Sequence, residues 1–522
     1  MDNKFLLFIG SKASSFVFST SLLVTILFNF PIFIFIAENT SIYSLSGATI
    51  ALSIFSLIFT LTLVFSSLLI LISPLFFKIF LAISTILNAI SIYFMITYQV
   101  VLDRSMMGNI INTRYSESVE LLSLQLVFFT LCFGVIPAWF VIRTKVYNLN
   151  RLKVCTNLII VVITSSLFLY LNASSWLWVD KYASLIGGKI LPWSYIINTG
   201  RHYSSINKTT AGQRLLPDGK FSNTDKMVFV LVIGETARSD NFSLYGYPKN
   251  TNPQLQQLSN LLVLKNTKSC TTYTTGSLAC ILSHSESISN TEFLPTYLAR
   301  NGAEVIWRSN NWGEPAIKVS SYIDASVLRP SCVGDGCNLD EVLLTNLLSV
   351  INSSSQQKIF IVLHTKGSHG PSYYKRYTKT FEQFLPVCKF EEISKCSQKE
   401  LINAYDNTIL YTDHFLTSVV KTLEQLNETS TAMMYISDHG ESLGENGLYL
   451  HGTPYAFAPD YQKDIPFIMW MSDTFIANKN VDINSIKQSS KHTQFNVFHT
   501  VLGAIELESP IYNKNLDILN TQ

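Results

Sequence analysis

Charged residues are scarce in this sequence. Asp, Glu, Lys and Arg make up 14% of its 522 residues, against 48% for hydrophobic residues, and the mean hydropathy is positive. A composition this apolar argues against an ordinary soluble protein and predicts membrane segments. The 38 basic and 36 acidic residues nearly balance, so there is no bulk positive charge of the kind that attracts nucleic acid.

The hydrophobicity is concentrated before about residue 175, in five apolar runs. No small-x-small cleavage site follows the first run, which argues against a cleaved signal peptide. Each run is near the ~20 residues that a helix needs to cross a membrane. The runs lie at about 14–37, 46–72, 75–98, 121–142 and 154–172. We therefore predict a five-helix transmembrane domain at 1–172, a polar, irregular bridge at 173–225 that partly lies on the membrane, and a soluble domain at 226–522.

Basic residues predict how these spans are oriented. Lys and Arg gather before the first run, between the second and third, and between the fourth and fifth: Lys4, Lys12, Lys78, Arg143, Lys145, Arg151 and Lys153. The positive-inside rule then places the N-terminus in the cytoplasm. Because five is an odd number of spans, everything after about residue 173 lies on the far side of the membrane.

The sequence has no Cys-x-x-Cys spacing, which weakens a zinc-ribbon interpretation. Of its 8 cysteines, Cys132 and Cys155 fall inside apolar runs. The other six lie in three close pairs: Cys270 and Cys280, Cys332 and Cys337, and Cys388 and Cys396. Six cysteines allow fifteen connectivities, so the sequence does not decide their pairing. Their position on the non-cytoplasmic side favours disulfides and indicates an oxidising compartment such as a bacterial periplasm.

Three strand-like apolar runs of the soluble domain end in side chains that bind metals. The stretches are 227–238, 358–371 and 432–452, and they alternate with helical segments. This alternation predicts a mostly parallel sheet covered by helices on both faces, in which the strand ends converge on one edge. Carboxylates and imidazoles suit Zn²⁺, and the alternative is a solvated Glu and a surface turn. The side chains concerned are Glu235, His364, His369, Asp438, His439 and His451.

A loop rich in threonine lies between Cys270 and Cys280, with the sequence SCTTYTTGSLAC over 269–280. A hydroxyl at a helix N-terminus faces unsatisfied N–H groups, which suits phosphate binding, and coordination to a metal would activate it as a nucleophile. Ordinary N-capping is the alternative. The pattern does not choose among the four threonines.

The predicted far-side loop at about 99–120 carries a polar stripe. Asn109, Thr113 and Glu117 are spaced four residues apart, so they lie on roughly one face of a helix. The stripe suits a lipid headgroup, and the alternative is a solvated amphipathic helix on the membrane surface.

Together these segments resemble the phosphoethanolamine transferases of Gram-negative inner membranes, most nearly the lipid A-modifying type that includes the mobile colistin-resistance enzymes. The resemblance covers essentially the whole chain. It implies a multi-domain protein with five transmembrane helices and a periplasmic α/β domain of the alkaline phosphatase/sulfatase fold. The motifs that carry it are GETAR, the Cys-bracketed threonine loop, HxxxxHGP, INAYDN (402–407), SDHGESLGENGLYLHG and AFAP (456–459).

The resemblance also assigns roles to residues. It implies a zinc site made of Glu235, Thr274, Asp438 and His439, with Thr274 as the nucleophile. Residues implied to bind a second metal or the transferred phosphate are His369, His451, His364 and Asn311. The implied headgroup residues are Asn109, Thr113 and Glu117, and disulfides are expected for Cys270–Cys280, Cys332–Cys337 and Cys388–Cys396. One departure is Pro315, which stands where the family has a phosphate-contacting lysine. The alternatives are that Lys318 substitutes from a shifted position and that the contact is missing.

The implied reaction is zinc-dependent transfer of phosphoethanolamine from phosphatidylethanolamine to lipid A through a phosphoethanolamine-threonine intermediate, giving polymyxin resistance. One tightly bound Zn²⁺ is expected, with room for a second during turnover, in a monomer of the bacterial inner membrane that contacts membrane lipids. Other envelope acceptors, such as core sugar or periplasmic glucan, remain alternatives. So do phosphoglycerol transfer and a silent headgroup sensor. A sulfatase is disfavoured because no Cys-x-Pro-x-Arg segment exists.

Overall fold

The computed structural model describes residues 10–40, 44–113, 118–119, 121–147, 149–173, 175–209, 213–286, 290–390, 393–486 and 491–520. The chain forms two compact units. The first comprises Met1–Ile111 and Leu122–Ser204, and the second comprises Asn112–Leu121 and Ser205–Gln522. Each unit has its own apolar core.

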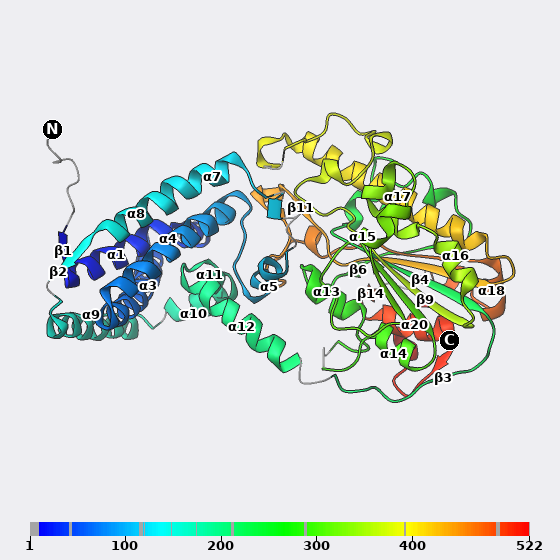
Figure 1. Cartoon of the computed structure of the whole chain (residues 1–522), viewed down its shortest axis with the longest axis horizontal. Coiled ribbons are helices and arrows are strands. Elements are labelled where there is room, and N and C mark those ends of the chain that lie inside the picture. The colour runs from blue at the N-terminus through cyan, green and yellow to red at the C-terminus, as the bar shows by residue number, and fades with distance from the viewer. Residues whose placement is uncertain are drawn as a thin grey trace. The chain divides into compact units, whose positions relative to one another are not determined.

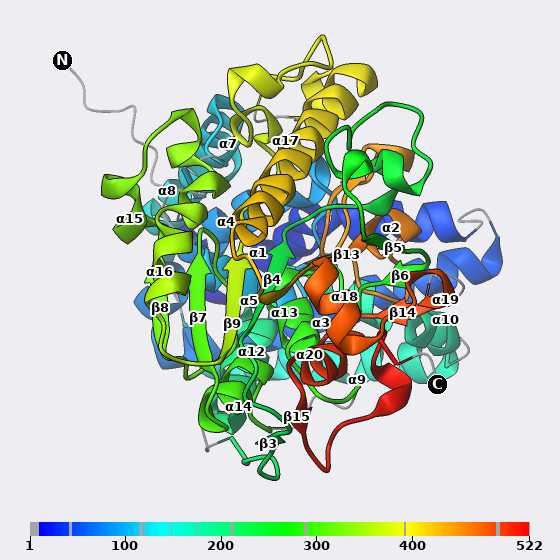
Figure 2. The ribbon, with the colours of Figure 1, turned by 90° about the vertical axis from the view of Figure 1, so that its right-hand side faces the viewer.

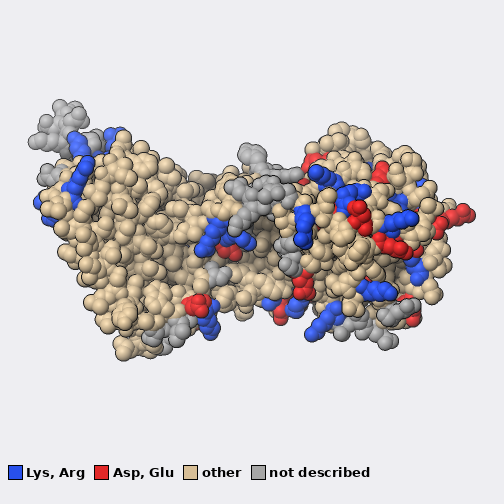
Figure 3. Space-filling model, turned by 90° about the horizontal axis from the view of Figure 1, so that it is seen from below, with Lys and Arg blue, Asp and Glu red and all other residues tan. Residues whose placement is uncertain are grey.

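The first unit is helical. Its elements are β1 (Gly10–Lys12), α1 (Ala13–Phe28), α2 (Phe30–Asn39), α3 (Leu45–Ile72), α4 (Pro74–Thr97), α5 (Arg104–Asn112), α7 (Leu124–Thr130), the π-helix η1 (Leu131–Val135), α8 (Ile136–Arg143), β2 (Lys145–Tyr147) and α9 (Arg151–Leu171). The two short strands pair in parallel. On the face drawn in Figure 3 this unit has a broad band almost free of Lys, Arg, Asp and Glu. Such a surface suits a hydrocarbon environment.

All five predicted apolar runs are helical, and the first of them is broken. Within the described residues, α3, α4, Leu124–Arg143 and α9 are each long and apolar enough to span a membrane. The bent pair α1 and α2 qualifies only as a unit, with an angle of 49° between its halves. Pro31 lies in the first turn of α2, where its missing N–H and its ring prevent the preceding helix from continuing.

The stretch at 173–225 differs from its prediction as an irregular bridge. It contains α10 (Ser175–Lys181), α11 (Ala183–Lys189) and α12 (Trp193–Thr209). The residues up to Ser204 belong to the first compact unit. These helices are more polar than the spans, so the apolar pattern that marks a membrane helix does not reveal them.

The second unit is built on a sheet that has seven strands in the described part of the chain. The strands are β4 (Met227–Gly234), β5 (Leu261–Leu264), β7 (Glu304–Ser309), β8 (Ser321–Asp324), β9 (Lys358–His364), β10 (Ser430–Ser437) and β13 (Phe467–Met471). Their order is β5-β13-β10-β4-β9-β7-β8 (Figure 2). Among the seven described strands, β13 alone runs in the direction opposite to the others, so the predicted mostly parallel sheet is confirmed.

Helices cover both faces of this sheet. α16 (Leu347–Ser353) and α17 (Gln398–Glu424) lie on one face, and α13 (Thr274–Ile281), α14 (Leu294–Arg300) and α20 (Asn496–Ile505) lie on the other (Figure 1). The central strand β4 is buried along its whole length, as expected for a strand covered on both sides. Its alternate residues Phe229, Leu231 and Ile233 belong to the core that α13, α14 and α20 complete. Burying each such side chain contributes about 1.5–3 kcal/mol.

Three disulfides tie loops of the second unit. They join Cys270 to Cys280, Cys332 to Cys337 and Cys388 to Cys396, the nearest-neighbour pairs expected above. The thiols of Cys132 and Cys155 are free. The disulfide between Cys270 and Cys280 spans the threonine loop and α13, which positions Thr274.

Candidate metal centre

Two adjacent strands and one helix bring four of the expected residues together. β4 and β10 are parallel, and Gly234 pairs with Ser437 at their carboxyl ends. Glu235 therefore emerges beside Asp438 and His439. Thr274 is the first residue of α13. All four side chains are buried, with exposed fractions of 4% or less, so their polar atoms must find partners among one another or in a bound ion.

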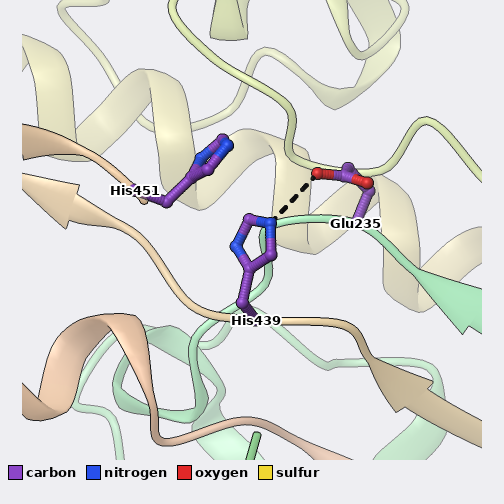
Figure 4. A group of neighbouring side chains, drawn as sticks. All are labelled: Glu235, His439 and His451. Atoms are coloured by element: carbon purple, nitrogen blue, oxygen red, sulfur yellow. Dashed lines mark ion pairs between the residues drawn. The ribbon is translucent and has the colours of Figure 1, made fainter. Parts of the chain in front are cut away.

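The distances place these side chains around one point. The Thr274 hydroxyl donates to Glu235 Oε1 at 3.2 Å and lies 3.5 Å from His439 Nε2. His439 Nε2 is 3.5 Å from Glu235 Oε1 (Figure 4) and 3.2 Å from Asp438 Oδ2. Two carboxylates, an imidazole nitrogen and a hydroxyl thus converge, which is a donor set that suits Zn²⁺.

The hydrogen bonds around the cluster leave one nitrogen of His439 and one oxygen of Asp438 available to bind an ion. Nδ1 of His439 lies 2.9 Å from the Gly440 carbonyl, so this nitrogen carries the proton and Nε2 presents a lone pair to the site. Asp438 Oδ1 accepts from the backbone N–H groups of Thr236 and His439. Asp438 Oδ2 is buried without a hydrogen-bond partner. A metal ion would satisfy this oxygen, so the residues fit such a group.

Burial and mutual charge perturb the acids and bases here. Burial raises the pKa of Asp438 well above its usual range, and the neighbouring Glu235 raises it further. Burial also acts to raise the pKa of Glu235, but His439, His369 and His451 outweigh it and hold that pKa below its usual range. Burial lowers the pKa of His439 to about 3. The cluster thus combines a carboxylate with a neutral imidazole, as metal ligation requires.

Two further histidines and an unforeseen carboxylate adjoin the cluster. Ligand atoms of Glu235, His439 and His451 all lie within 4.8 Å of one another, and the His369 and His451 rings are 6.0 Å apart. His451 Nδ1 is 3.5 Å from Oε2 of Glu441, which is completely buried. The sequence analysis missed Glu441. Its one signal is that it follows Asp438-His439 closely in the glycine-rich loop.

The remaining expected residues have different surroundings. Asn311 Nδ2 donates to Glu235 Oε2 at 2.8 Å and to the Thr365 carbonyl at 3.0 Å, so it orients the Glu235 carboxylate. The ring of His364 instead lies 3.2 Å from Ser309 Oγ and 3.9 Å from Glu314 Oε2. Lys318 is exposed, and its backbone N–H donates to Thr296.

The headgroup stripe belongs to a different part of the chain. Asn109 lies in α5, and Thr113 follows the end of that helix. Both are partly buried. Glu117, the third member, lies outside the described residues.

Comparison with known proteins gives consistent results. A family model described as "Phosphoethanolamine transferase EptA/EptB" matches residues 57–206, and one described as "Sulfatase" matches residues 228–507. The chain is 37% identical over 511 residues to phosphoethanolamine transferase EptA of Helicobacter pylori, covering 96% of this chain and 95% of that protein. It is 30% identical to phosphatidylethanolamine transferase Mcr-1 of Escherichia coli, covering 81% and 82%.

A solved structure matches both parts of the chain at once. The integral membrane protein lipooligosaccharide phosphoethanolamine transferase A of Neisseria meningitidis aligns with a TM-score of 0.88 and 30% identity, covering 98% of this chain and 99% of that one. The arrangement of an N-terminal transmembrane domain and a C-terminal sulfatase-like domain is therefore shared.

Proposed function

The chain belongs to the phosphoethanolamine transferases of the EptA family, and from this membership we propose that it transfers phosphoethanolamine from phosphatidylethanolamine to lipid A through Thr274. The observation that carries the proposal is the position of the Thr274 hydroxyl, 3.2 Å from Glu235 Oε1 and 3.5 Å from His439 Nε2 at the first turn of α13. The names of two relatives support the lipids involved, since one is a phosphatidylethanolamine transferase and the other acts on lipooligosaccharide.

In the proposed first step the Thr274 oxygen attacks the phosphorus of the donor. The Thr274 hydroxyl gives up its proton to solvent, a bond forms between its oxygen and phosphorus, the bond to the diacylglycerol oxygen breaks, and phosphoethanolamine-threonine remains. Thr274 is the first residue of α13, so the amide N–H groups in the first turn of this helix would offset negative charge on a phosphoryl group bound to it. The ring of His451, beside Glu441, is placed to supply a proton to the leaving oxygen.

In the second step a phosphate or hydroxyl oxygen of lipid A attacks the same phosphorus, the bond to the Thr274 oxygen breaks, and that oxygen takes up a proton to restore the hydroxyl. Glu235, Thr274, Asp438 and His439 would hold one Zn²⁺. When bound, this ion would lower the pKa of the threonine hydroxyl and neutralise charge on the phosphoryl oxygens. Asn311 keeps Glu235 in place, and His369 and His451 line the side on which a phosphate or a second ion would bind.

We place the protein in the bacterial inner membrane with its catalytic unit in the periplasm. The donor headgroup is assigned to Asn109, Thr113 and Glu117, and the protein acts as a monomer. Support comes from the basic residues at the cytoplasmic ends of the predicted spans and from the three disulfides of the second unit. Adding ethanolamine to lipid A would reduce its anionic charge and weaken binding of polymyxins.

The test is a mass spectrum of lipid A from a colistin-sensitive host that expresses this chain, compared with its Thr274→Ala variant. We expect one added phosphoethanolamine with the natural chain and none with the variant at equal membrane abundance. Modified lipid A from the Thr274→Ala strain would exclude Thr274 as the nucleophile. Unmodified lipid A in both strains would indicate that the acceptor is another envelope glycan. Phosphoglycerol on an acceptor would show that the donor is not phosphatidylethanolamine.

A further inference from the structure

A long apolar groove runs through the first unit between three of its spans. Its volume is about 640 Å³. Its walls come from α1 and the start of α2, from α4, and from the helix Leu124–Arg143. These helices run side by side (Figure 1). Side chains that line it include Leu23, Leu27, Phe30, Ile92, Phe129 and Phe133.

The groove follows one face of α4 over much of its length. The lining residues Leu81, Thr85, Ile92 and Ile96 recur at helical spacing. Leu81 and Ile96 are 15 positions apart, which at ~1.5 Å per residue makes the groove about 22 Å long. One leaflet of a bilayer has about 15 Å of hydrocarbon, half of the ~30 Å core. The groove is therefore long enough for a complete acyl chain.

The chemistry of the lining suits an acyl chain. The hydroxyls of Thr20 and Thr85 donate to the carbonyls of Phe16 and Leu81 on their own helices, each at 2.7 Å. Both hydroxyls are therefore satisfied by their own helices and leave no unpaired polar group in the groove. Since the groove lies among membrane-spanning helices, where water is excluded, a hydrocarbon chain is the ligand that matches both the walls and the surroundings.

The walls are fixed by helix irregularities. Asn29, at the break between α1 and α2, accepts from the Leu191 N–H at 2.9 Å and donates to the Leu191 carbonyl at 3.0 Å. In the fourth span, α7 and α8 are joined by the π-helix η1. Gly134 of η1 packs so closely on α4 that a Cβ there would lie 3.1 Å from Ile86 Cα. These contacts fix the backbones of the helices that form the groove walls.

One end of the groove leads to the segment assigned to the lipid headgroup. Ile96 is next to the last residue of α4, and α5 with Asn109 begins at Arg104. The connection between them is held firmly. The Leu102 N–H donates to the Gly188 carbonyl at 2.9 Å, and the Leu102 carbonyl accepts from Asn198 Nδ2 at 2.7 Å.

We propose that this groove holds one acyl chain of the phosphatidylethanolamine donor while residues of α5 hold its headgroup. The inference rests on the proposed function for the identity of the donor. The bilayer is as apolar as the groove, so the groove contributes packing and position for the chain and little hydrophobic driving force.

The kinetic test places a larger side chain in the groove at a partly exposed position, where the neighbouring helices do not have to repack. Leu27 lines it and is 56% exposed, whereas Leu68 on α3 is 51% exposed and does not line it. We expect Leu27→Trp to raise KM for dipalmitoyl phosphatidylethanolamine roughly fivefold, which corresponds to about 1 kcal/mol of lost packing between the acyl chain and the groove. KM for the dihexanoyl donor, whose short chains cannot fill the groove, stays unchanged. Leu68→Trp leaves both values unchanged. Equal KM values for Leu27→Trp and the natural chain would overturn the proposal.

A second measurement does not depend on transfer. The full-length protein is cross-linked in vesicles with phosphatidylethanolamine that carries a diazirine on one acyl chain. We expect labelled peptides from α1, α4 and Leu124–Arg143, with labelling reduced by Leu27→Trp and retained in Leu68→Trp. Even labelling that includes the exposed face of α9, or equal labelling by a phosphatidylglycerol probe, would overturn a donor-specific site. Selective labelling without any transfer would leave the groove in place and refute the proposed function alone.

Discussion

Asn311 is the residue whose effect on the metal centre is easiest to isolate. Its side chain donates to Glu235 Oε2 at 2.8 Å and would not itself touch the ion. We predict that Asn311→Leu weakens zinc binding about 10- to 100-fold, the usual effect of removing a group that orients a ligand. Competition with a chromophoric chelator measures this. Asn310→Leu is the matched control, because Asn310 donates to Asp340 instead. Equal zinc affinity in the Asn311→Leu and Asn310→Leu proteins would show that zinc binding does not require Asn311 to orient Glu235.

Asp438 makes metal binding depend on pH. Burial and the charge of Glu235 raise its pKa well above the usual range, so the metal-free carboxyl retains its proton at pH values where a solvated Asp is ionised. Zinc must displace that proton, and the apparent affinity therefore rises with pH until the raised pKa is passed. Calorimetry in two buffers of different ionisation enthalpy should show proton release.

The Thr274→Ala variant distinguishes the proton released by Asp438 from a proton released by the Thr274 hydroxyl. Proton release that persists in Thr274→Ala and disappears in Asp438→Asn assigns it to Asp438. Release that disappears in Thr274→Ala and persists in Asp438→Asn would contradict the prediction.

Sequence patterns predicted the edge of the sheet where the site lies, but they did not select every residue. Strand ends marked Glu235 and Asp438 because parallel strands meet at one edge. The four threonines were equivalent until the chain folded. Thr271 now contacts Ser277 and Thr272 contacts the Thr453 carbonyl, whereas the Thr274 hydroxyl contacts Glu235 and His439. Only the resemblance to known enzymes had identified Thr274, since orientation within a loop depends on contacts distant in sequence.

Among the larger elements, the disulfide-closed threonine loop should matter for both stability and activity. A disulfide whose cysteines are 10 positions apart contributes roughly 2–3 kcal/mol in the chain-entropy model. We predict that the Cys270→Ser/Cys280→Ser protein has a lower Tm and also a lower transfer rate, because Thr274 loses its fixed position. The Cys332→Ser/Cys337→Ser protein should have a lower Tm than the natural chain and an unchanged transfer rate. Initial rates and thermal unfolding of purified protein test both, and equal rates in the two double variants would be contrary to this account.

Elements defined by strong apolar periodicity were predicted well, and polar helices were not. The central strand β4 and the spans α3 and α4 follow directly from unbroken apolar runs. α12 was missed because much of its sequence is polar, so it resembles a loop until tertiary contacts such as that of Asn198 with Leu102 are known. The break at Asn29 was missed because the apolar composition continues on both sides of it.

On the scale of the whole molecule, that break decides the topology. The described chain has four helices of spanning length, and the bent pair α1 and α2 is either a fifth crossing or a re-entrant loop. With four crossings, the N-terminus and the catalytic unit would lie on the same side. The positive-inside rule predicts from Lys4 and Lys12 that the N-terminus is cytoplasmic, while three disulfides favour an oxidising compartment for the second unit. Both conditions hold only if the bent pair crosses the membrane.

Single cysteines placed before α1 and after α12 can test whether the bent pair crosses the membrane. After Cys132 and Cys155 are replaced by Ser, Lys12→Cys reports on the N-terminal side and Leu215→Cys, at a side chain that is 63% exposed, reports on the catalytic side. We predict that a membrane-impermeant maleimide labels Leu215→Cys in intact spheroplasts and labels Lys12→Cys only after lysis. Labelling of both from outside would make α1 and α2 a re-entrant loop. The disulfide-bearing unit would then still be periplasmic, and the basic residues at the N-terminus would lie on the side that the positive-inside rule disfavours.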